Sequence, residues 1–579
     1  MKTFNLKTLS KALFVLGVTT AFMGGCSSDQ TEELTTQRPT ITFTNTTDIY
    51  VVKVGKVLTL EPTVENDHDA IYSWTTADGK LLGREKKFTY SWGEAGQVYL
   101  TFRVVTEQGT AQKEIRVDVA TLVPPRISLA VPKDGYIILK GQPLELNPQV
   151  DNNASASYEW RVDTKIVATT QKYTFNSAIA GTFHVALATA NEDGTDALEF
   201  DVKVMEPAAM PFAWLFEQEV YHVAKGRTIR LLPYGITNAF DGQYCWTVDG
   251  KEVQRSNNPL YIFHATTEGK YAVTVAMTNS YLTVSKQLTV EVCPPEGRYK
   301  RAATASSKSE WNKVYEFLAA PGQFVNEGYM ASTAAQAVTC AEALMRKGAH
   351  VSLGGFGGYL VLGFDHSIEN DGGYNFQIIG NSFEGSSEPG VVYVMQDENG
   401  DNLPNDTWYE LKGSEYGKAE TIQDYEITYY RPSSARMPVA WSDNQGKTGS
   451  VDYLAAYHTQ DYYYPLWVTA ASYTLRGTCL KSRTNEVTSG YWSNDAFEWG
   501  YADNFSSIDR LTNTDNHDAG VNANHFRISD AVTFDGKPAN LQYIDFVKVQ
   551  TCVNAKAGWL GEVSVEVFGA RDFNLIKNK

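Results

Sequence analysis

Oxygen-bearing side chains are concentrated in one short segment of the chain, residues 397–410. They stand at relative positions 1, 3 and 5, and further acids follow downstream; the residues are Asp397, Asn399, Asp401, Asp406 and Glu410. Calcium prefers several oxygen ligands on a flexible loop. The match to an EF-hand is partial, because Asn402 stands where that loop needs glycine and Trp408 where it needs glutamate. The segment predicts either a structural Ca2+ site or an Asx-rich hairpin without metal.

Aromatic residues are dense between positions 441 and 501, in a stretch that is also rich in Asn, Asp, Ser and Gly. Tyr and Trp offer a flat apolar face with a polar edge, which suits capture of a sugar or a large amphipathic cofactor. For any single ring, packing beneath a loop is the alternative. As a cluster they predict a ligand platform, made of Trp441, Tyr462, Tyr463, Tyr464, Trp467, Tyr491, Trp492 and Trp499 together with Asp503.

Motifs of the common catalytic sites are absent: the sequence has no HExxH, no GxSxG and no Walker loop. Acids near the aromatic residues would be able to supply the two carboxylates of a glycosidase, namely Glu384, Glu388, Asp495, Glu498 and Asp503. In a chain with 67 acidic residues such neighbours also arise by chance. We therefore expect a binding protein and not an enzyme.

Charge and cysteine content exclude several classes of partner and site. The formal net charge is -17, and no Lys/Arg cluster follows the N-terminal segment. Nucleic acids and anionic membrane surfaces are therefore not expected partners. Five cysteines follow Cys26, and none of them has CxxC spacing. An odd number of cysteines without this spacing indicates neither a disulfide framework nor a zinc site. Cys245 with Cys293 and Cys479 with Cys552 are the pairings we consider, and buried thiols are the alternative.

The N-terminus carries an export signal. Lys2, Lys7 and Lys11 precede an apolar run over residues 12–23, and Gly24-Gly25 then leads to Cys26. The run is too short for a membrane span, which needs about 20 apolar residues. The arrangement predicts a lipobox with Cys26 as the lipidated residue of the mature protein, and a plain secretory signal is the alternative. The polar, acidic residues 27–33 resemble the signal that sends Bacteroidetes lipoproteins to the outer face of the outer membrane.

Three tandem repeats follow. A Tyr-x-Trp element recurs at Trp74, Trp160 and Trp246, 86 residues apart each time. Alternating apolar and polar residues in short runs, separated by turn residues, predict a β-sandwich with the tryptophan in its core. The repeats resemble PKD-like and other immunoglobulin-like modules of bacterial surface proteins. Prolines at the junctions favour a stalk that holds a distal domain away from the bilayer.

The remaining sequence predicts one larger β-rich domain. Helical spacing is clear only over residues 332–348, and the glycine-rich stretch 354–358 lies between two expected strands, which favours a hairpin over a phosphate loop. We predict a mainly β chain: three tandem Ig-like/PKD-like sandwiches and then a larger β-sandwich or jelly-roll-like domain with one helix. The predicted segments are a signal peptide (1–25), a lipidated acidic tether (26–38), modules at 39–123, 124–207 and 208–296, and the C-terminal domain (297–579).

The C-terminal domain resembles that of a family of Bacteroidetes surface lipoproteins. The similarity lies in residues 321–328, 352–358, 363–366, 387–390 and 408–411, and again in 545–549 and 558–562. Some members are associated with uptake of corrinoids (vitamin B12) beside TonB-dependent transporters. The resemblance implies a surface protein that captures a corrinoid and passes it to such a transporter. A glycan-binding protein or glycosidase of a polysaccharide-utilisation system is the alternative, and a purely structural adhesin would bury its aromatic rings throughout.

Overall fold

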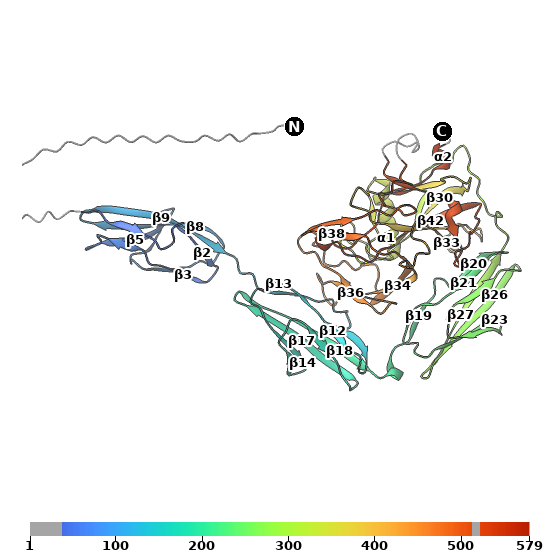
Figure 1. The fold of residues 1–579 in the computed structure, drawn as a ribbon, viewed down its shortest axis with the longest axis horizontal. Helices are drawn as coiled ribbons and strands as arrows, with labels where there is room; N and C mark the ends of the chain where they lie inside the picture. The colour runs from blue at the N-terminus through green and yellow to red at the C-terminus, as the bar shows by residue number, and fades with distance from the viewer. Residues whose placement is uncertain (1–36, 512–520, 578–579) are drawn as a thin grey trace, which may run out of the picture. The chain divides into compact units, whose positions relative to one another are not determined.

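A computed structural model of the protein describes residues 37–511 and 521–577. Cys26 lies outside the described residues, so its lipidation stays a prediction. The chain divides between Val123 and Pro124 into two compact units, which are described separately (Figure 1). Within the described ranges, no helix is both long and apolar enough to cross a bilayer.

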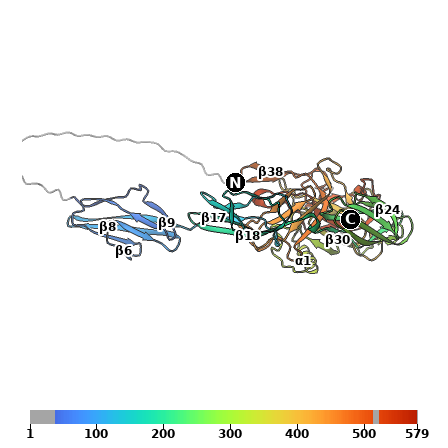
Figure 2. The same cartoon turned by 90° about the horizontal axis from the view of Figure 1, so that it is seen from below.

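The first unit is a β-sandwich built around Trp74. Its largest sheet has the strand order β2-β9-β8-β5-β6, in which β2 is parallel to β9, and β8 and β9 lie side by side in Figure 1 and Figure 2. Trp74 is fully buried, and its indole N–H donates to the Glu85 carbonyl at 3.0 Å. The strands are β1 (Thr40–Thr42), β2 (Ile49–Lys53), β3 (Val57–Leu60), β4 (Thr63–Glu65), β5 (Ile71–Thr76), β6 (Leu81–Gly83), β7 (Phe88–Ser91), β8 (Gly96–Thr106) and β9 (Gly109–Ala120).

The second and third modules repeat this topology. Their large sheets have the orders β11-β18-β17-β14-β15 and β20-β27-β26-β23-β24, again with a parallel first pair. Trp160 and Trp246 occupy the position of Trp74 and are equally buried, which confirms the sandwich prediction. The second module has β10 (Arg126–Ser128), β11 (Tyr136–Leu139), β12 (Leu144–Leu146), β13 (Gln149–Asp151), β14 (Ser157–Val162), β15 (Lys165–Ala168), β16 (Tyr173–Phe175), β17 (Gly181–Asn191) and β18 (Gly194–Met205). The third has β19 (Ala213–Leu215), β20 (Val220–Ala224), β21 (Thr228–Leu231), β22 (Tyr234–Thr237), β23 (Gln243–Val248), β24 (Lys251–Ser256), β25 (Tyr261–His264), β26 (Gly269–Thr278) and β27 (Thr283–Cys293).

The C-terminal domain is a larger β-sandwich. An antiparallel sheet of order β28-β30-β42-β32-β33-β41 faces a sheet of order β40-β31-β44, and residues of both enter one apolar core. The six-stranded sheet contains β28 (Lys313–Leu318), β30 (Tyr359–Glu369), β32 (Gly390–Met395), β33 (Trp408–Leu411), β41 (Ala531–Val532) and β42 (Tyr543–Thr551). The second sheet contains β31 (Phe376–Ile379), β40 (Ala523–Phe526) and β44 (Gly569–Asp572). The strands β29 (Val351–Ser352) and β43 (Glu566–Val567) form a separate short antiparallel pair, and β43 directly precedes β44 in the chain.

Two insertions extend this sandwich. One is a four-stranded sheet of order β36-β35-β34-β37, formed by β34 (Ile422–Tyr430), β35 (Val439–Asp443), β36 (Thr448–Val451) and β37 (Ser472–Cys479). The other is the hairpin of β38 (Thr484–Thr488) and β39 (Tyr491–Asn494). The predicted helix is α1 (Ala334–Arg346), which Thr333 caps by accepting from the Gln336 N–H at 3.2 Å. A four-residue helix, α2 (Asn574–Lys577), ends the described chain.

The second and third modules contact the C-terminal domain directly. Lys133 N–H donates to the Arg431 carbonyl at 2.7 Å, which fastens the second module. In the third module, Arg227 donates to the Ala539 carbonyl at 2.7 Å, and Arg230 pairs with Asp424 at 2.8 Å. These two modules are therefore part of the same compact unit as the C-terminal domain. The stalk prediction required modules that do not contact the C-terminal domain, so it does not hold for these two. Only the first module forms a unit of its own.

The structure also tests the predictions for the cysteines and for the glycine-rich stretch. All five cysteines of the described chain are free thiols, so the pairings Cys245–Cys293 and Cys479–Cys552 are not formed. The glycine-rich stretch connects β29 to β30, but β29 pairs with β43 and β30 pairs with β28 and β42, so the predicted hairpin is not formed. A Cβ atom at Gly358 would lie 1.8 Å from the Leu353 carbonyl oxygen, so close backbone approach explains a glycine at this position.

Replacing Trp74 by alanine in the isolated module 37–123 is expected to lower its free energy of unfolding by about 3–5 kcal/mol, because a fully buried ring leaves a cavity. Urea denaturation followed by circular dichroism measures the effect. The control is Val51→Ala, since Val51 is 69% exposed and should change stability by less than about 0.5 kcal/mol. Equal midpoints for the two variants would contradict a core role for Trp74.

Candidate functional site

Exposed aromatic side chains of the C-terminal domain gather around one loop and one hairpin. Trp559 lies on the short 3-10 helix η4 (Gly558–Leu560) and is 50% exposed. Tyr491 at the start of β39 is 64% exposed, and Tyr457 is 60% exposed. Together with the half-buried Trp492, these rings are called the aromatic rim below. Large exposed rings in one place are typical of a binding surface, since folded chains usually bury them.

Backbone contacts hold the rim together. The Trp559 indole N–H donates to the Gly490 carbonyl at 2.7 Å, which joins η4 to the turn between β38 and β39. The Tyr457 and Trp559 ring centroids are 5.7 Å apart at an interplanar angle of 41°. Trp492 packs so closely on Gly558 that a Cβ atom there would lie 2.2 Å from its indole nitrogen. These contacts fix Tyr457, Trp492 and Trp559 relative to one another, and Tyr491 is the residue next to Trp492 on β39.

A small cavity of about 100 Å³ adjoins the rim, because Gly558 and Gly561 at the ends of the η4 turn also line it. Trp441 forms part of its wall, and Asp452, Asn554 and Lys556 supply polar groups. Lys556 is paired with Asp452 at 2.6 Å. Sites for drug-sized ligands usually measure about 300–1,000 Å³. A larger ligand would therefore lie across the rim and place only one substituent in this cavity.

Glu562 is the buried acid of the same cavity. One of its carboxylate oxygens accepts from the Gln323 N–H at 2.8 Å, and the other has no hydrogen-bond partner. Burial raises the pKa of Glu562 to about 8. The side chain is therefore largely a neutral acid at neutral pH and offers a hydrogen-bond donor to a ligand.

Several rings of the predicted platform lie in cores. Tyr463 and Tyr464 are each 1% exposed, and their hydroxyls donate to the carbonyls of His458 and Ala470 at 2.9 and 3.0 Å. Trp467 is 7% exposed and packs 5.6 Å from Phe317 in the main core. Tyr462 is half-buried. Of the predicted rings, the structure brings only Tyr491 and Trp492 into the rim, with Trp441 in the adjoining cavity.

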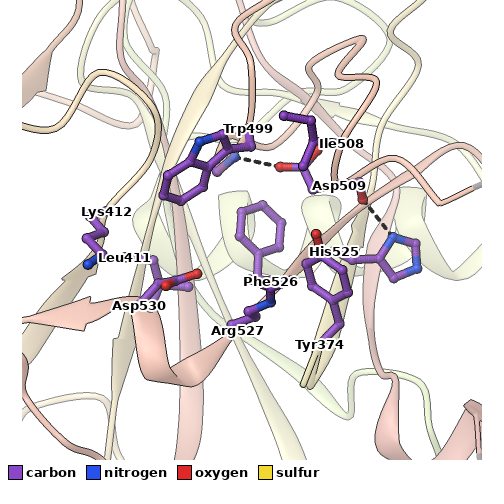
Figure 3. A pocket seen from close by; sticks show the side chains of 11 residues that line it. Tyr374, Leu411, Lys412, Trp499, Ile508, Asp509, His525, Phe526, Arg527 and Asp530 are labelled. Atoms are coloured by element: carbon purple, nitrogen blue, oxygen red, sulfur yellow. Dashed lines mark hydrogen bonds between the residues drawn. The ribbon is translucent and has the colours of Figure 1, made fainter. Parts of the chain in front are cut away.

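Trp499 belongs to a different cavity, of about 230 Å³ (Figure 3). Several of its polar groups contact one another across the wall of the cavity. Asp509 accepts from the Gly500 N–H at 2.5 Å, the His525 ring contacts the Asp509 carbonyl at 3.0 Å, and the Arg527 guanidinium lies 4.5 Å from the Tyr374 ring centroid. This cavity therefore has less to offer a ligand than the rim.

The acidic segment 397–410 forms a loop of Asx turns. Asp397 accepts from the N–H groups of Gly400 and Asn402 at 2.8 and 3.1 Å, and Asp401 accepts from that of Leu403 at 2.8 Å. Asn399 likewise accepts from the Asp401 N–H at 2.9 Å. These bonds explain the Asx-rich composition without a metal. Calcium binding at this loop stays a prediction.

The loop also joins the C-terminal domain to the third module. The Ala224 N–H donates to Glu398 at 2.9 Å, and His222 contacts the Asn405 carbonyl at 3.1 Å. Asp406 is buried and neither carboxylate oxygen accepts a hydrogen bond, although the His222 Nδ1 lies 3.9 Å from one of them; burial raises its pKa to about 9. Glu410 lies one strand away on β33, where Thr478 donates to it at 2.5 Å. The structure therefore does not direct all five predicted metal ligands at one point.

The glycosidase candidates divide between the surface and the interior. Glu384, Asp495 and Glu498 are exposed, whereas Asp503 is 1% exposed. Carboxylate oxygens of Asp503, Glu388 and Glu566 lie within 4.8 Å of one another. Retaining glycosidases hold their two carboxyl groups about 5–5.5 Å apart on either side of a substrate. Here the oxygens of three acids, two of them buried, lie closer together than that.

Comparison with known proteins agrees with the modules. The family of PKD-like domains matches residues 38–106 and 124–191. The chain carries PKD-like, immunoglobulin-like repeats. Tandem domains of this kind indicate an extracellular or cell-surface protein.

Solved structures with tandem immunoglobulin-like domains are also similar to this chain. The titin I-band fragment I67–I69 is 14% identical, covers 44% of this chain and 98% of its own, and has a TM-score of 0.21. Immunoglobulin domains 1–5 of Sidekick-1 are 14% identical over 44% of this chain and 59% of their own, with a TM-score of 0.24. The three N-terminal domains of the bacteriophage RB49 outer capsid protein Hoc are 14% identical over 44% and 97%, with a TM-score of 0.21.

Trp559 is the rim residue that the sequence prediction of the platform missed. Its segment lies 58 residues beyond the dense aromatic stretch, which ends at Tyr501. A local signal was present, because Trp559 and Leu560 stand between Gly558 and Gly561. Glycines on both sides indicate a turn, and a tryptophan at a turn has no regular core position available to it.

Changing Glu562 to glutamine is expected to reduce the loss of stability between pH 5 and pH 8. The pKa of Glu562 is raised above its unfolded value, so the folded chain binds the extra proton and loses stability as pH rises toward about 8. Glutamine keeps the shape without ionising. Melting temperatures of wild type and Glu562→Gln across this range measure the difference. Parallel curves would contradict a buried, proton-binding Glu562.

Proposed function

We propose that the protein is a lipoprotein, anchored to the outer membrane through Cys26 and facing the exterior, that captures a ligand with its C-terminal domain. The N-terminal signal supports the anchor, and the tandem PKD-like modules support the surface location. The ligand would be handed to an outer-membrane TonB-dependent transporter. The site that would do the capturing is the aromatic rim.

A corrinoid is the first ligand candidate. A corrin ring presents broad apolar faces and a periphery of amide groups, and it needs no catalysis from its carrier. Trp559 and Tyr491, both at least half exposed, supply flat apolar faces, and Asp452, Asn554 and Lys556 supply polar groups beside them. The family resemblance of the C-terminal domain supports this choice over other amphipathic molecules. The exposed rim is the single observation that carries the proposal.

An oligosaccharide is the second candidate, and the Tyr457–Trp559 pair favours it. Two exposed rings with centroids 5.7 Å apart suit the apolar faces of sugar residues, and adjacent acid and amide groups suit their hydroxyls. Hydrolysis is not part of either proposal. Asp503 is buried and Glu388 is half-buried, and neither lines the cavity beside the rim.

Titration calorimetry of cyanocobalamin into soluble residues 27–579 tests the proposal. We expect one-to-one binding that Trp559→Ala and Tyr491→Ala each weaken by about 10-fold or more, because each ring provides about 150–250 Å² of contact surface. Tyr491→Ala should keep the wild-type melting temperature, since its ring is exposed, whereas Trp559→Ala also removes the hydrogen bond to Gly490 and should lower it slightly.

Trp467→Ala is the matched control, because Trp467 is buried in the main core. It should lower the melting temperature and leave the affinity of the folded protein unchanged. Wild-type affinity in Trp559→Ala would contradict the rim as the site. If cyanocobalamin gives no heat or spectral shift and a glycan screen gives a ligand lost in Trp559→Ala, the oligosaccharide is the correct ligand.

A further inference from the structure

Three carboxylates from distant parts of the sequence meet inside the C-terminal domain. Glu388 lies in the loop between β31 and β32, Asp503 follows β39, and Glu566 lies on β43. One carboxylate oxygen from each lies within 4.8 Å of the others. Asp503 is 1% and Glu566 3% exposed. Among the described residues this is the group of three acids whose oxygens converge in this way.

Nothing in the surrounding protein neutralises this cluster. Within the described part of the chain, none of the three acids forms an ion pair with lysine, arginine or histidine. The charges that act on Glu566 are those of Glu388, Asp503 and Glu562, and the charge that acts on Asp503 is that of Glu388, so all of them are negative. Burying even one unpaired carboxylate costs several kcal/mol. Three like charges in one buried volume therefore need either shared protons or a cation.

Glu566 gives the second, independent indication of a ligand. Both of its carboxylate oxygens are buried and neither has a hydrogen-bond donor. By contrast, Asp503 is held by backbone N–H groups, accepting from Asn381 and Ser382 at 2.9 Å and from Glu566 at 3.0 Å. Glu566 is therefore a buried carboxylate whose side-chain neighbour is another acid, Glu388, and it has free oxygens with which to bind a cation.

Neutral oxygens with unused capacity flank the cluster. The Ser382 hydroxyl is buried without a partner, and the Ser382 N–H donates to Asp503. The side-chain carbonyl of Asn494 is likewise buried and unpartnered, and the Asn494 carbonyl accepts from the Ser387 N–H at 3.0 Å. Carboxylate, hydroxyl and amide oxygens without nitrogen or sulfur are the donor set of a hard divalent cation.

We propose that Glu388, Asp503 and Glu566 form a binding site for a hard divalent cation, for which Ca2+ is the best fit. The site is separate from the 397–410 loop and independent of the ligand identity proposed above. The cation would tie three loops together beneath the rim. The Asn494 N–H donates to the Gly385 carbonyl at 2.8 Å, so the 380–390 loop is bonded to the strand that carries Tyr491 and Trp492.

The alternative occupant is a proton shared between Glu388 and Glu566. The two possibilities predict opposite effects of Glu566→Gln. If a proton occupies the site, glutamine removes a buried repulsion and stabilises the chain whether or not calcium is present. If a cation occupies it, glutamine removes a ligand and abolishes stabilisation by calcium.

The test uses residues 27–579 stripped with EDTA and then titrated with CaCl2, with binding followed by calorimetry and stability by melting temperature. We expect calcium to bind and to raise the melting temperature of the wild type. Glu566→Gln should weaken binding by more than about 10-fold, the lower end of what changes around metal ligands cause. In EDTA it should melt at or above the wild-type temperature, which shows that the variant folds.

Two controls separate this site from its surroundings. Glu384→Gln changes an exposed acid of the same loop and should leave calcium binding unchanged. Asp401→Asn should affect only a second binding event, if the 397–410 loop provides one. The proposal is overturned if the wild type neither binds nor is stabilised by millimolar Ca2+. It is also overturned if Glu566→Gln binds like the wild type, or if Asp401→Asn alone abolishes binding.

Discussion

Burial of strand β42 on both faces is the constraint on which the C-terminal domain depends. The strand lies between β30 and β32 in the six-stranded sheet. Val547 and Val549 enter the main core, whereas Phe546 on the opposite face packs with Val361 and Met395. A sheet whose second face is also apolar needs a second cover. The insertions and the third module supply that cover.

The second cover explains why the dense aromatic stretch is not the ligand platform that its composition predicts. Gln550 of β42 donates to the Arg476 carbonyl of β37 at 3.2 Å, which places the inserted four-stranded sheet over this face. Lys548 lies 4.5 Å from the Tyr393 ring centroid and 4.8 Å from that of Trp408, with its pKa lowered by burial. Tyr463 and Tyr464 then pack in the core of the inserted sheet. Composition reveals how many rings a segment has, but only the layer order reveals which of them are covered.

The same distinction separates what sequence reasoning reached from what it missed. Repeats at a fixed spacing, the helix with its Thr333 cap and the strand character of β42 are local patterns, and all are present in the structure. Glu388, Asp503 and Glu566 are each more than 60 residues apart in the chain, so no spacing motif joins them. Asp503 entered the candidate list only because it lies near aromatic residues. Its actual partners follow from the pairing of β29 with β43 and of the 380–390 loop with β39.

Docking of the third module also bears on how the rim would work. Arg227 and Arg230 tie that module to the Ala539 carbonyl and to Asp424, and Glu398 accepts from the Ala224 N–H. The pairs are partly buried, and their several attachment points restrict relative motion more than one exposed ion pair would. The exposure of Tyr491 and Trp559 persists with the second and third modules in place. The rim therefore belongs to a compact unit that also contains the second and third modules, so a ligand bound there is presented by this larger unit and not by the C-terminal domain alone.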